Sequence, residues 1–230
     1  MSDTSKKAPV RISPARKKLL AGYAEAAGRL YGALSISEFV GVFNYYERKK
    51  TDEQEAVPVL LRYKELHPLD VYYTVYNEYI TGPELVPGFY EEDIGNLRLL
   101  RAKQEGKPRY LPDEKQEFLK YSGANHREPE KPYEELKAYI INNGLFDNVE
   151  VDDYDVVEGG LIDLHNMIKK RAEMIEIIEY FTESGYEFSG ADQLNAFTQV
   201  VMTAQNNTRL HENNGHTQDE LNKDQHSFNL

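Results

Sequence analysis

The sequence predicts a mainly α-helical, multi-helical protein with one small β-hairpin in its N-terminal half. Apolar residues recur at helical spacing along most of the 230 residues, and amphipathic helices of this kind bury their apolar faces against one another. One run, residues 71–81 (VYYTVYNEYIT), is instead β-branched and aromatic, which is typical of two strands joined by a tight turn. Apolar side chains make up 40% of the chain, which is enough to bury a core and excludes global disorder.

The first half opens with the signals of two helices. Ser13 can cap the first helix, Pro14 suits its first turn and Gly32 suits its end. Ser37 followed by Glu38 predicts the start of the second.

Residues 51–54 (TDEQ) have the form of a capping box for a third helix. Because proline removes a helical hydrogen bond, we expect either a kink at Pro58 or a helix that starts near Val57. Beyond the hairpin, helical patterns resume over residues 91–103 and 113–121.

Helices followed by a hairpin also suggest a winged-helix outline. The recognition helix of a DNA-binding member should be basic, whereas residues 37–66 mix Lys and Arg with a similar number of acidic residues. This balance favours protein contact or scaffolding over groove binding.

Residues 122–131 (SGANHREPEK) are polar and contain glycine and proline, which is typical of a domain boundary. We therefore expect a helical domain with the hairpin over residues 13–125 and an all-helical domain over residues 130–222.

The second half reads as helices throughout. One helix is predicted to start near Pro132 and to end at Asn143-Gly144. An acidic, interrupted segment covers residues 147–158. Gly159-Gly160 is predicted to be a break or hinge before a long amphipathic stretch, residues 161–181.

The last helices are predicted from their caps. Ser189 caps a helix that ends at residues 213–215 (NNG), and Thr217 with Glu220 forms a capping box for a short final helix. We expect residues 223–230 to be a frayed tail.

Charge is unevenly distributed. Residues 1–18 carry a net charge of +5, whereas the whole chain carries −12. Residues 1–12 are predicted to be a disordered basic arm. The acidic remainder repels phosphate backbones, which disfavours a nucleic acid as partner.

Several classes of protein are excluded by what the chain lacks. The absence of cysteine excludes disulfides, thiolate zinc sites and cysteine nucleophiles. No apolar run reaches the roughly 20 residues of a bilayer helix, and no signal-peptide core follows Met1. We therefore expect a cytoplasmic protein with no membrane segment.

Tyrosine is unusually common, with 17 residues and no tryptophan. Tyr72, Tyr73, Tyr76 and Tyr79 crowd the predicted hairpin. Exposed tyrosine makes a good anchor for a partner because it buries much area with few rotors. The alternative is ordinary cross-strand aromatic packing.

Histidine offers the clearest pattern for a metal. His211 and His216 resemble a zincin motif, but they are five residues apart rather than four, so they do not share a helix face. A composite site using Asp163, His165, His211 and His216 stays open because imidazole and carboxylate bind divalent metals. No phosphate loop is present, and we expect no cofactor.

Two stretches resemble a known family. Asn206-Asn-Thr-Arg209, followed by Gly215-His-Thr217 and Glu220-Leu221, resembles a segment of uncharacterised bacterial proteins that carry a C-terminal SEC-C zinc knuckle. Leu30-Tyr-Gly32 with Ser35-Ile-Ser-Glu-Phe39 is similar to the opening of those proteins. Gln218 stands where the pattern has proline, and the cysteines of the knuckle are absent, so no metal role is implied. The resemblance implies that Arg209 and His216 do more than pack, although a helix dipole also explains a cation at Arg209.

These observations favour a non-enzymatic protein-interaction or adaptor module that contacts another protein or a second copy of itself. Its predicted contact residues are Tyr72, Tyr73, Tyr76, Tyr79, Arg209 and His216. One alternative is a metal-dependent hydrolase or metal-binding domain built on His165, His211 and His216. The other is a nucleic-acid regulator that acts through the basic arm.

Overall fold

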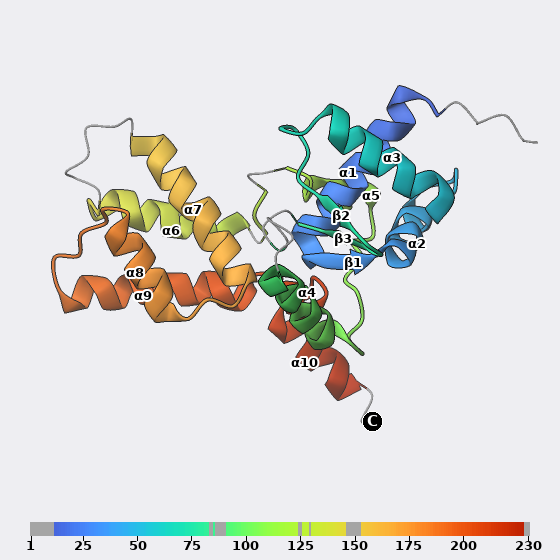
Figure 1. The fold of residues 1–230 in the computed structure, drawn as a ribbon. Helices are drawn as coiled ribbons and strands as arrows, with labels where there is room; N and C mark the ends of the chain where they lie inside the picture. The colour runs from blue at the N-terminus through green and yellow to red at the C-terminus, as the bar shows by residue number, and fades with distance from the viewer. Residues whose placement is uncertain are drawn as a thin grey trace, which may run out of the picture.

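The computed structural model describes residues 12–82, 85, 91–123, 126–128, 130–145 and 153–227. Within them the chain forms ten α-helices, one 3-10 helix and a three-stranded antiparallel sheet, which confirms the predicted fold class. Figure 1 shows the elements from residues 14–81 and 115–120 gathered on one side and those from residues 130–207 on the other. The basic arm, apart from Ile12, and residues 147–152 of the acidic segment lie outside the described residues.

Helix α1 (Pro14–Tyr31) has the ends that the sequence predicts. The side chain of Ser13 accepts the N–H of Arg16 at the N-cap, and Gly32 is the C-cap with φ at 72°. A side chain at this φ would strain the backbone, so glycine suits the position.

Helix α2 (Ile36–Tyr46) is capped by Ser35, so it begins before the predicted Ser37. The Ser35 hydroxyl accepts the N–H of Glu38, and the Glu38 carboxylate accepts the N–H of Ser35. This reciprocal capping box satisfies two donors at once, and it places Ser37 inside the first turn.

Helix α3 (Glu53–Leu66) is capped by Asp52, whose carboxylate accepts the N–H of Glu55. Pro58 lies inside the helix, so the alternative start near Val57 is wrong. The neighbours Val59 and Leu60 are buried, and their packing outweighs the one hydrogen bond that proline removes.

The hairpin is confirmed and is part of a larger sheet. Strands β2 (Thr74–Tyr76) and β3 (Tyr79–Thr81) pair antiparallel, and Asn77 turns the chain with φ at 50°. A strand that the sequence did not predict, β1 (Ala33–Ser35), pairs with β3 and gives the order β1-β3-β2. The succession α1-β1-α2-α3-β2-β3 with this strand order matches the winged-helix outline.

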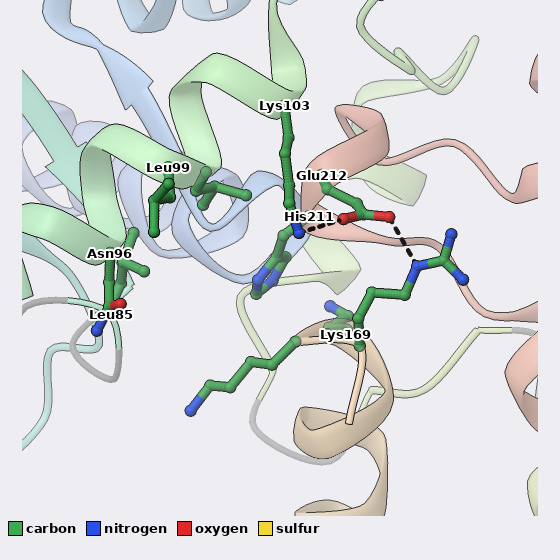
Figure 2. A pocket seen from close by; sticks show the side chains of 10 residues that line it. Leu85, Asn96, Leu99, Lys103, Lys169, His211 and Glu212 are labelled. Atoms are coloured by element: carbon green, nitrogen blue, oxygen red, sulfur yellow. Dashed lines mark hydrogen bonds and ion pairs between the residues drawn. The ribbon is translucent and has the colours of Figure 1, made fainter. Parts of the chain in front are cut away.

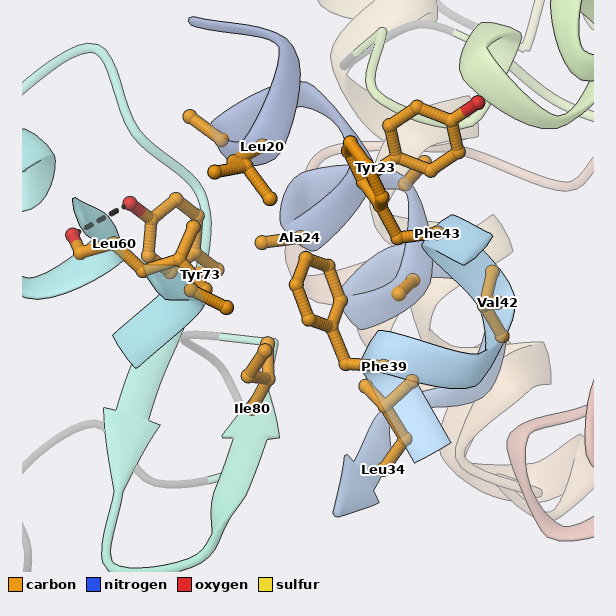
Figure 3. Packing of buried hydrophobic residues seen from close by; sticks show 14 of the residues in the cluster. Leu20, Tyr23, Ala24, Leu34, Phe39, Val42, Phe43, Leu60, Tyr73 and Ile80 are labelled. Atoms are coloured by element: carbon orange, nitrogen blue, oxygen red, sulfur yellow. Dashed lines mark hydrogen bonds between the residues drawn. The ribbon is translucent and has the colours of Figure 1, made fainter. Parts of the chain in front are cut away.

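The N-terminal core lies between α1, α2, α3 and the sheet. Figure 3 shows Phe39 and Leu34 facing Ile80 and Tyr73, with the Tyr73 hydroxyl bonded to the carbonyl of Leu60. Tyr23 packs on Phe43 and Phe118, with ring centroids 4.8 and 5.5 Å apart. Phe118 comes from helix α5 (Lys115–Lys120), which is shorter than the predicted 113–121.

The second core is formed by four helices from the C-terminal half: α6 (Glu130–Asn142), α7 (Asp153–Lys169), α8 (Met174–Glu183) and α9 (Ala191–Asn207). Its buried centre includes Tyr133, Leu161, Phe181 and Phe197. Helix α4 (Glu91–Gln104), the 3-10 helix η1 (His211–Asn213) and helix α10 (Gln218–Ser227) complete the chain. Figure 1 shows α4 and α10 between the two groups. No helix of the described residues is both long enough and apolar enough to cross a membrane.

The predicted amphipathic stretch 161–181 is two helices, α7 and α8, separated by a turn. Arg171 adopts φ of 66°, and the N–H of Ala172 reaches back to the carbonyl of Met167. This arrangement closes a helix end and normally uses glycine. Because arginine stands at this position, the turn could not be predicted from residue type.

The ends of α9 also differ from prediction. Gly190, not Ser189, is its N-cap, and the helix ends at Asn207, before residues 213–215. The predicted capping box of the last helix is confirmed: Thr217 accepts the N–H of Glu220, and Glu220 accepts the N–H of Thr217. Helix α10 continues to Ser227, and residues 228–230 of the predicted tail lie outside the described residues.

Gly159 and Gly160 do not break the chain, because both lie inside α7. A Cβ built on Gly160 would lie 2.6 Å from the hydroxyl oxygen of Tyr186, whose side chain is buried in the C-terminal core. Gly160 is therefore explained by the close approach of a tyrosine and not by a hinge.

We expect Gly160→Ala to destabilise the protein by about 1–3 kcal/mol, because the added methyl overpacks the core. Gly159→Ala should instead stabilise it by up to about 1 kcal/mol, because its Cβ meets nothing within 4 Å and alanine favours helix. Urea denaturation measures both, and Gly160→Ala combined with Tyr186→Phe should recover most of the loss. Equal effects at the two glycines would contradict this account.

Candidate functional site at the junction of the two cores

The C-terminal end of α1 is capped by side chains from other elements. Its last carbonyls have no donors within the helix. The side-chain amide of Gln104 donates to the carbonyl of Tyr31 at 2.7 Å, while the Lys169 ammonium, at 2.6 Å, and the His211 ring, at 3.0 Å, contact the carbonyl of Arg29. Lys169 is also attracted by the negative end of the helix dipole. These contacts join the two halves of the chain.

The turn that contains Asn214 and Gly215 lies against the N-terminal half. The Asn214 side chain donates to the backbone carbonyls of Gln104, the last residue of α4, and of Lys107. The backbone carbonyl of Asn214 accepts the N–H of Tyr110 at 3.0 Å. A Cβ on Gly215 would lie 3.0 Å from Leu30. Residues 206–221, for which the sequence predicts a family resemblance, therefore connect the two cores.

Arg209 lies at the centre of a cluster beside this turn. Its guanidinium lies 3.4 Å from the ring centroid of Tyr110 and forms ion pairs with Glu128 at 3.1 Å and Glu220 at 2.5 Å. His216 contacts the same Glu220 carboxylate at 3.3 Å. Burial alone would raise the pKa of Glu220, but the bonds from Arg209 and from the N–H of Thr217 lower it. Arg209 therefore has a structural role that a helix dipole alone does not describe.

A cavity of about 380 Å³ lies between α4, the C-terminal end of α7 and η1. We call it the junction pocket. Figure 2 shows Leu85, Asn96 and Leu99 on one side and Glu212 and Lys169 on the other, with Lys103 reaching across to Glu212. Lys169, Lys170 and Arg171 also line it, and Glu212 is the one acidic residue among its described lining residues. The pocket thus combines an apolar wall with an excess of positive charge.

Glu212 bridges two cations at the edge of the pocket. Its carboxylate lies 3.1 Å from the Lys103 ammonium and 2.7 Å from Nε of Arg171. Burial alone would raise the pKa of Glu212, but the bonds from Arg171 and Lys103 lower it. The left-handed backbone of Arg171 costs about 1–2 kcal/mol relative to an ordinary conformation. We infer that this strain is tolerated because the left-handed backbone places the Arg171 guanidinium beside the Glu212 carboxylate.

A second hollow of about 700 Å³ adjoins the junction pocket and shares Lys103, Arg171 and Glu212 with it. Its apolar wall includes Met174 and Met202. We call the two hollows together the junction groove. Two apolar walls, one on each side of a Lys103–Glu212–Arg171 bridge, can accept an extended segment with apolar side chains around an acidic one.

The structure brings together only part of the predicted histidine site. His165 and His211 line one small cavity, but the third histidine there is His126, and His216 contacts Glu220 and Tyr110 instead. Burial and the Lys169 charge lower the pKa of His211 to about 3, which keeps its ring neutral. Among the residues that the structure describes, no three His, Asp or Glu side chains are arranged to hold a metal ion.

The predicted tyrosines divide between core and surface. Tyr73 is fully buried in the N-terminal core, so it contributes nothing to a surface. Tyr76 and Tyr79 are partly buried beside Ala33 and Leu97. Tyr72 is exposed and stacks on the guanidinium of Arg29 at 4.4 Å. Cross-strand packing thus accounts for Tyr76 and Tyr79, which are paired in the register of β2 and β3, whereas Tyr73 precedes β2 and packs in the core.

Helix α3, which takes the place of a recognition helix, exposes leucine rather than arginine. Leu61 and Leu66 are about half exposed, and Leu69, just beyond the helix, is 91% exposed. Arg62 on the same helix is paired with Glu65. This face lacks the cationic surface that a phosphate backbone requires.

The sequence reasoning missed Lys103, Lys169, Lys170 and Arg171. The run Lys169-Lys170-Arg171 was the available signal, but it did not stand out, because Arg16-Lys17-Lys18 and Arg48-Lys49-Lys50 are basic triplets too. Lys103 has no such signal, because it approaches the triplet only through the folding of α4 against η1. Comparison of the chain with protein-family models, with curated proteins and with solved structures found no match, so the SEC-C resemblance stays a prediction.

Proposed function

We propose that the chain is a protein-interaction module that binds an acidic segment of a partner protein in the junction groove. The observation that carries the proposal is the Lys103–Glu212–Arg171 bridge between two apolar-walled hollows. A partner carboxylate can share these cations with Glu212, and its neighbouring apolar side chains can fill the hollows.

Charge complementarity favours an acidic occupant. The side chains of Lys103 and Arg171 are 60% and 51% exposed although both are ion-paired, so their remaining donors can reach a ligand. Charge-assisted hydrogen bonds to carboxylate are about twice as strong as neutral ones. In a chain of net charge −12, this local positive potential also directs an acidic segment to one place.

The apolar walls supply the remaining contact. Leu99 is 64% exposed in the junction pocket, and Met202 is 41% exposed in the second hollow. Methionine side chains adapt to varied shapes and are common on peptide-binding surfaces. Leucine or methionine in the partner would therefore suit both hollows.

The test uses short fluorescein-labelled peptides that carry leucine, glutamate and methionine at varied spacings, with matched peptides in which glutamine or lysine replaces the glutamate. Fluorescence polarisation should show that the glutamate peptides bind at least about tenfold more tightly than the glutamine ones, which corresponds to one charge-assisted contact. The lysine peptides should not bind.

Lys103→Met and Arg171→Met should each weaken binding of the glutamate peptide. Lys131→Met is the matched control, because Lys131 is highly exposed on α6 and pairs with Glu135. Binding that is indifferent to the peptide's charge, or unchanged in both groove variants, would overturn the proposal. Self-association that is abolished by the same two variants would identify a second copy as the occupant, and retention of a DNA duplex instead of peptide would favour the nucleic-acid alternative.

A further inference from the structure

Helix α3 turns one face to the core and the opposite face to solvent. The buried side consists of Ala56, Val59 and Leu60. The other side is a line of exposed side chains, which we call the α3 stripe: Pro58, Leu61, Arg62, Glu65, Leu66 and Leu69. Figure 1 shows α3 at the outer edge of the N-terminal group, on the side away from α4 and α10. None of these residues lines either hollow of the junction groove.

The apolar members of the α3 stripe lie close together. Leu61 and Leu66 are about half exposed, and Leu69, just beyond the helix, is almost fully exposed. Residues three, four, seven and eight positions after Pro58 share one side of a helix. Single exposed leucines are common on protein surfaces, but exposed apolar side chains gathered on one face indicate a contact surface.

The sequence of the stripe is symmetric about the point between Tyr63 and Lys64. Residues at equal distances from this point form three matched pairs: Arg62 with Glu65, Leu61 with Leu66, and Pro58 with Leu69. A two-fold axis at this point would bring two α3 helices together antiparallel. It would set each residue level with its counterpart on the second copy, as a self-complementary interface requires.

Arg62 and Glu65 make the stripe complementary to itself in charge. Within one copy they form an exposed ion pair at 2.5 Å. In the antiparallel arrangement, Arg62 lies level with Glu65 of the second copy and Glu65 with its Arg62, so four charges alternate in sign around the axis. The flanking Leu61 and Leu66 exclude water from these charges, which strengthens their attraction. A parallel arrangement would instead set like charges level with each other and is disfavoured.

We propose that the α3 stripe binds a second copy of the chain, so that two antiparallel α3 helices form a two-fold symmetric dimer. One helix face is smaller than the roughly 20–30 residues that each partner contributes to a standard interface, so the dimer should be weak, with a Kd of about 10–100 µM. This inference does not depend on peptide binding in the junction groove.

Charge reversal tests the proposal, with analytical ultracentrifugation of the full chain over a concentration range that spans this Kd. Arg62→Glu leaves two acidic side chains on the stripe and Glu65→Arg leaves two basic ones. Each variant alone should therefore dimerise at least about tenfold more weakly than wild type. Mixed in equal amounts, the two variants should form a heterodimer, because an acidic stripe then meets a basic one. The double variant Arg62→Glu/Glu65→Arg should dimerise like wild type.

A pair of leucine variants separates the α3 stripe from the junction groove. Leu66→Ser should weaken the dimer, whereas Leu99→Ser, at a similarly exposed leucine of the junction pocket, should not. Circular dichroism of dilute, monomeric protein should show that every variant is folded like wild type.

Three results would overturn the proposal. One is a wild-type chain that stays monomeric at the highest concentration, and another is a mixture of the two charge-reversed variants that does so. The third is a dimer that Lys103→Met and Arg171→Met abolish but that both charge reversals leave intact, because this would place self-association in the junction groove.

Discussion

Replacing Gly32 with alanine is expected to destabilise the protein by about 3–5 kcal/mol through backbone strain and overpacking together. Gly32 has φ of 72° and ψ of −48°, a combination that side chains with a Cβ strongly disfavour. The added Cβ would also lie 2.8 Å from the His211 ring and 3.0 Å from Leu100. The substitution therefore acts at the contact between the two cores.

Gly106→Ala is the matched control for the backbone effect. Gly106 has φ of 75°, but an added Cβ meets nothing within 4 Å, so it should cost only about 1–2 kcal/mol. Amide hydrogen exchange locates the remaining effect. In Gly32→Ala, protection should fall at Tyr110, whose N–H bonds to Asn214 across the junction. Equal losses in the two variants, with Tyr110 protection retained, would show that Gly32 does not hold the junction together.

Elements whose signals are local were predictable. The caps at Ser13, Gly32 and Thr217 depend on hydrogen bonds within a few residues, so residue type and spacing were enough. Strand β1 was missed because its three residues have no pattern of their own and pair with β3 far along the chain. Pairing of this kind is set by tertiary contact rather than by propensity.

The misread glycines have the same explanation. The Tyr186 hydroxyl fills the space that a Cβ on Gly160 would need. A sequence pattern cannot show that Tyr186 lies there, so the glycine pair was predicted to be a break or hinge. The reverse error occurred at Arg171. The chain ends a helix there with a left-handed backbone, where glycine is the usual residue, so the turn was not predicted. Local rules fail where a distant contact outweighs local preference.

The candidate site was predictable only in part. Arg209 and His216 were singled out by the resemblance, and both lie in the Glu220 cluster beside the turn that joins the cores. The junction groove, in contrast, takes Lys103 from α4 and Arg171 from the end of α7. No periodicity relates these elements, so the groove emerges only when the chain is folded.

Arg209→Met is expected to lower the free energy of unfolding by about 2–4 kcal/mol. Breaking a buried ion pair costs about 3–5 kcal/mol, and the effect is reduced here because Glu128 and Glu220 are about one-third exposed. Methionine retains apolar contact with Tyr110 but leaves both carboxylates without their shared cation. Arg209→Lys should give an intermediate loss, because lysine keeps the charge but not the planar stacking. Urea denaturation at neutral pH measures each variant.

The pH dependence separates the ion pairs from simple packing. The pKa of Glu220 is lower in the folded protein than its ordinary value of 4.5. Burial raises this pKa, but the hydrogen bond from Arg209 and the other contacts lower it by more. A lowered folded pKa contributes stability above the unfolded pKa, and that stability is lost as the pH falls through the folded pKa. The gap between wild type and Arg209→Met should therefore narrow below pH 4.5. A gap that stays constant there would mean that packing, not charge, explains the loss.

Arg62→Met is the matched control, because Arg62 pairs with Glu65 where both side chains are well exposed. It should change stability by no more than about 0.5 kcal/mol. Arg209 does not line either hollow of the junction groove, so folded Arg209→Met should still bind the glutamate peptides. A variant that is folded but fails to bind would show that the Arg209 cluster positions the groove as well as stabilising the junction.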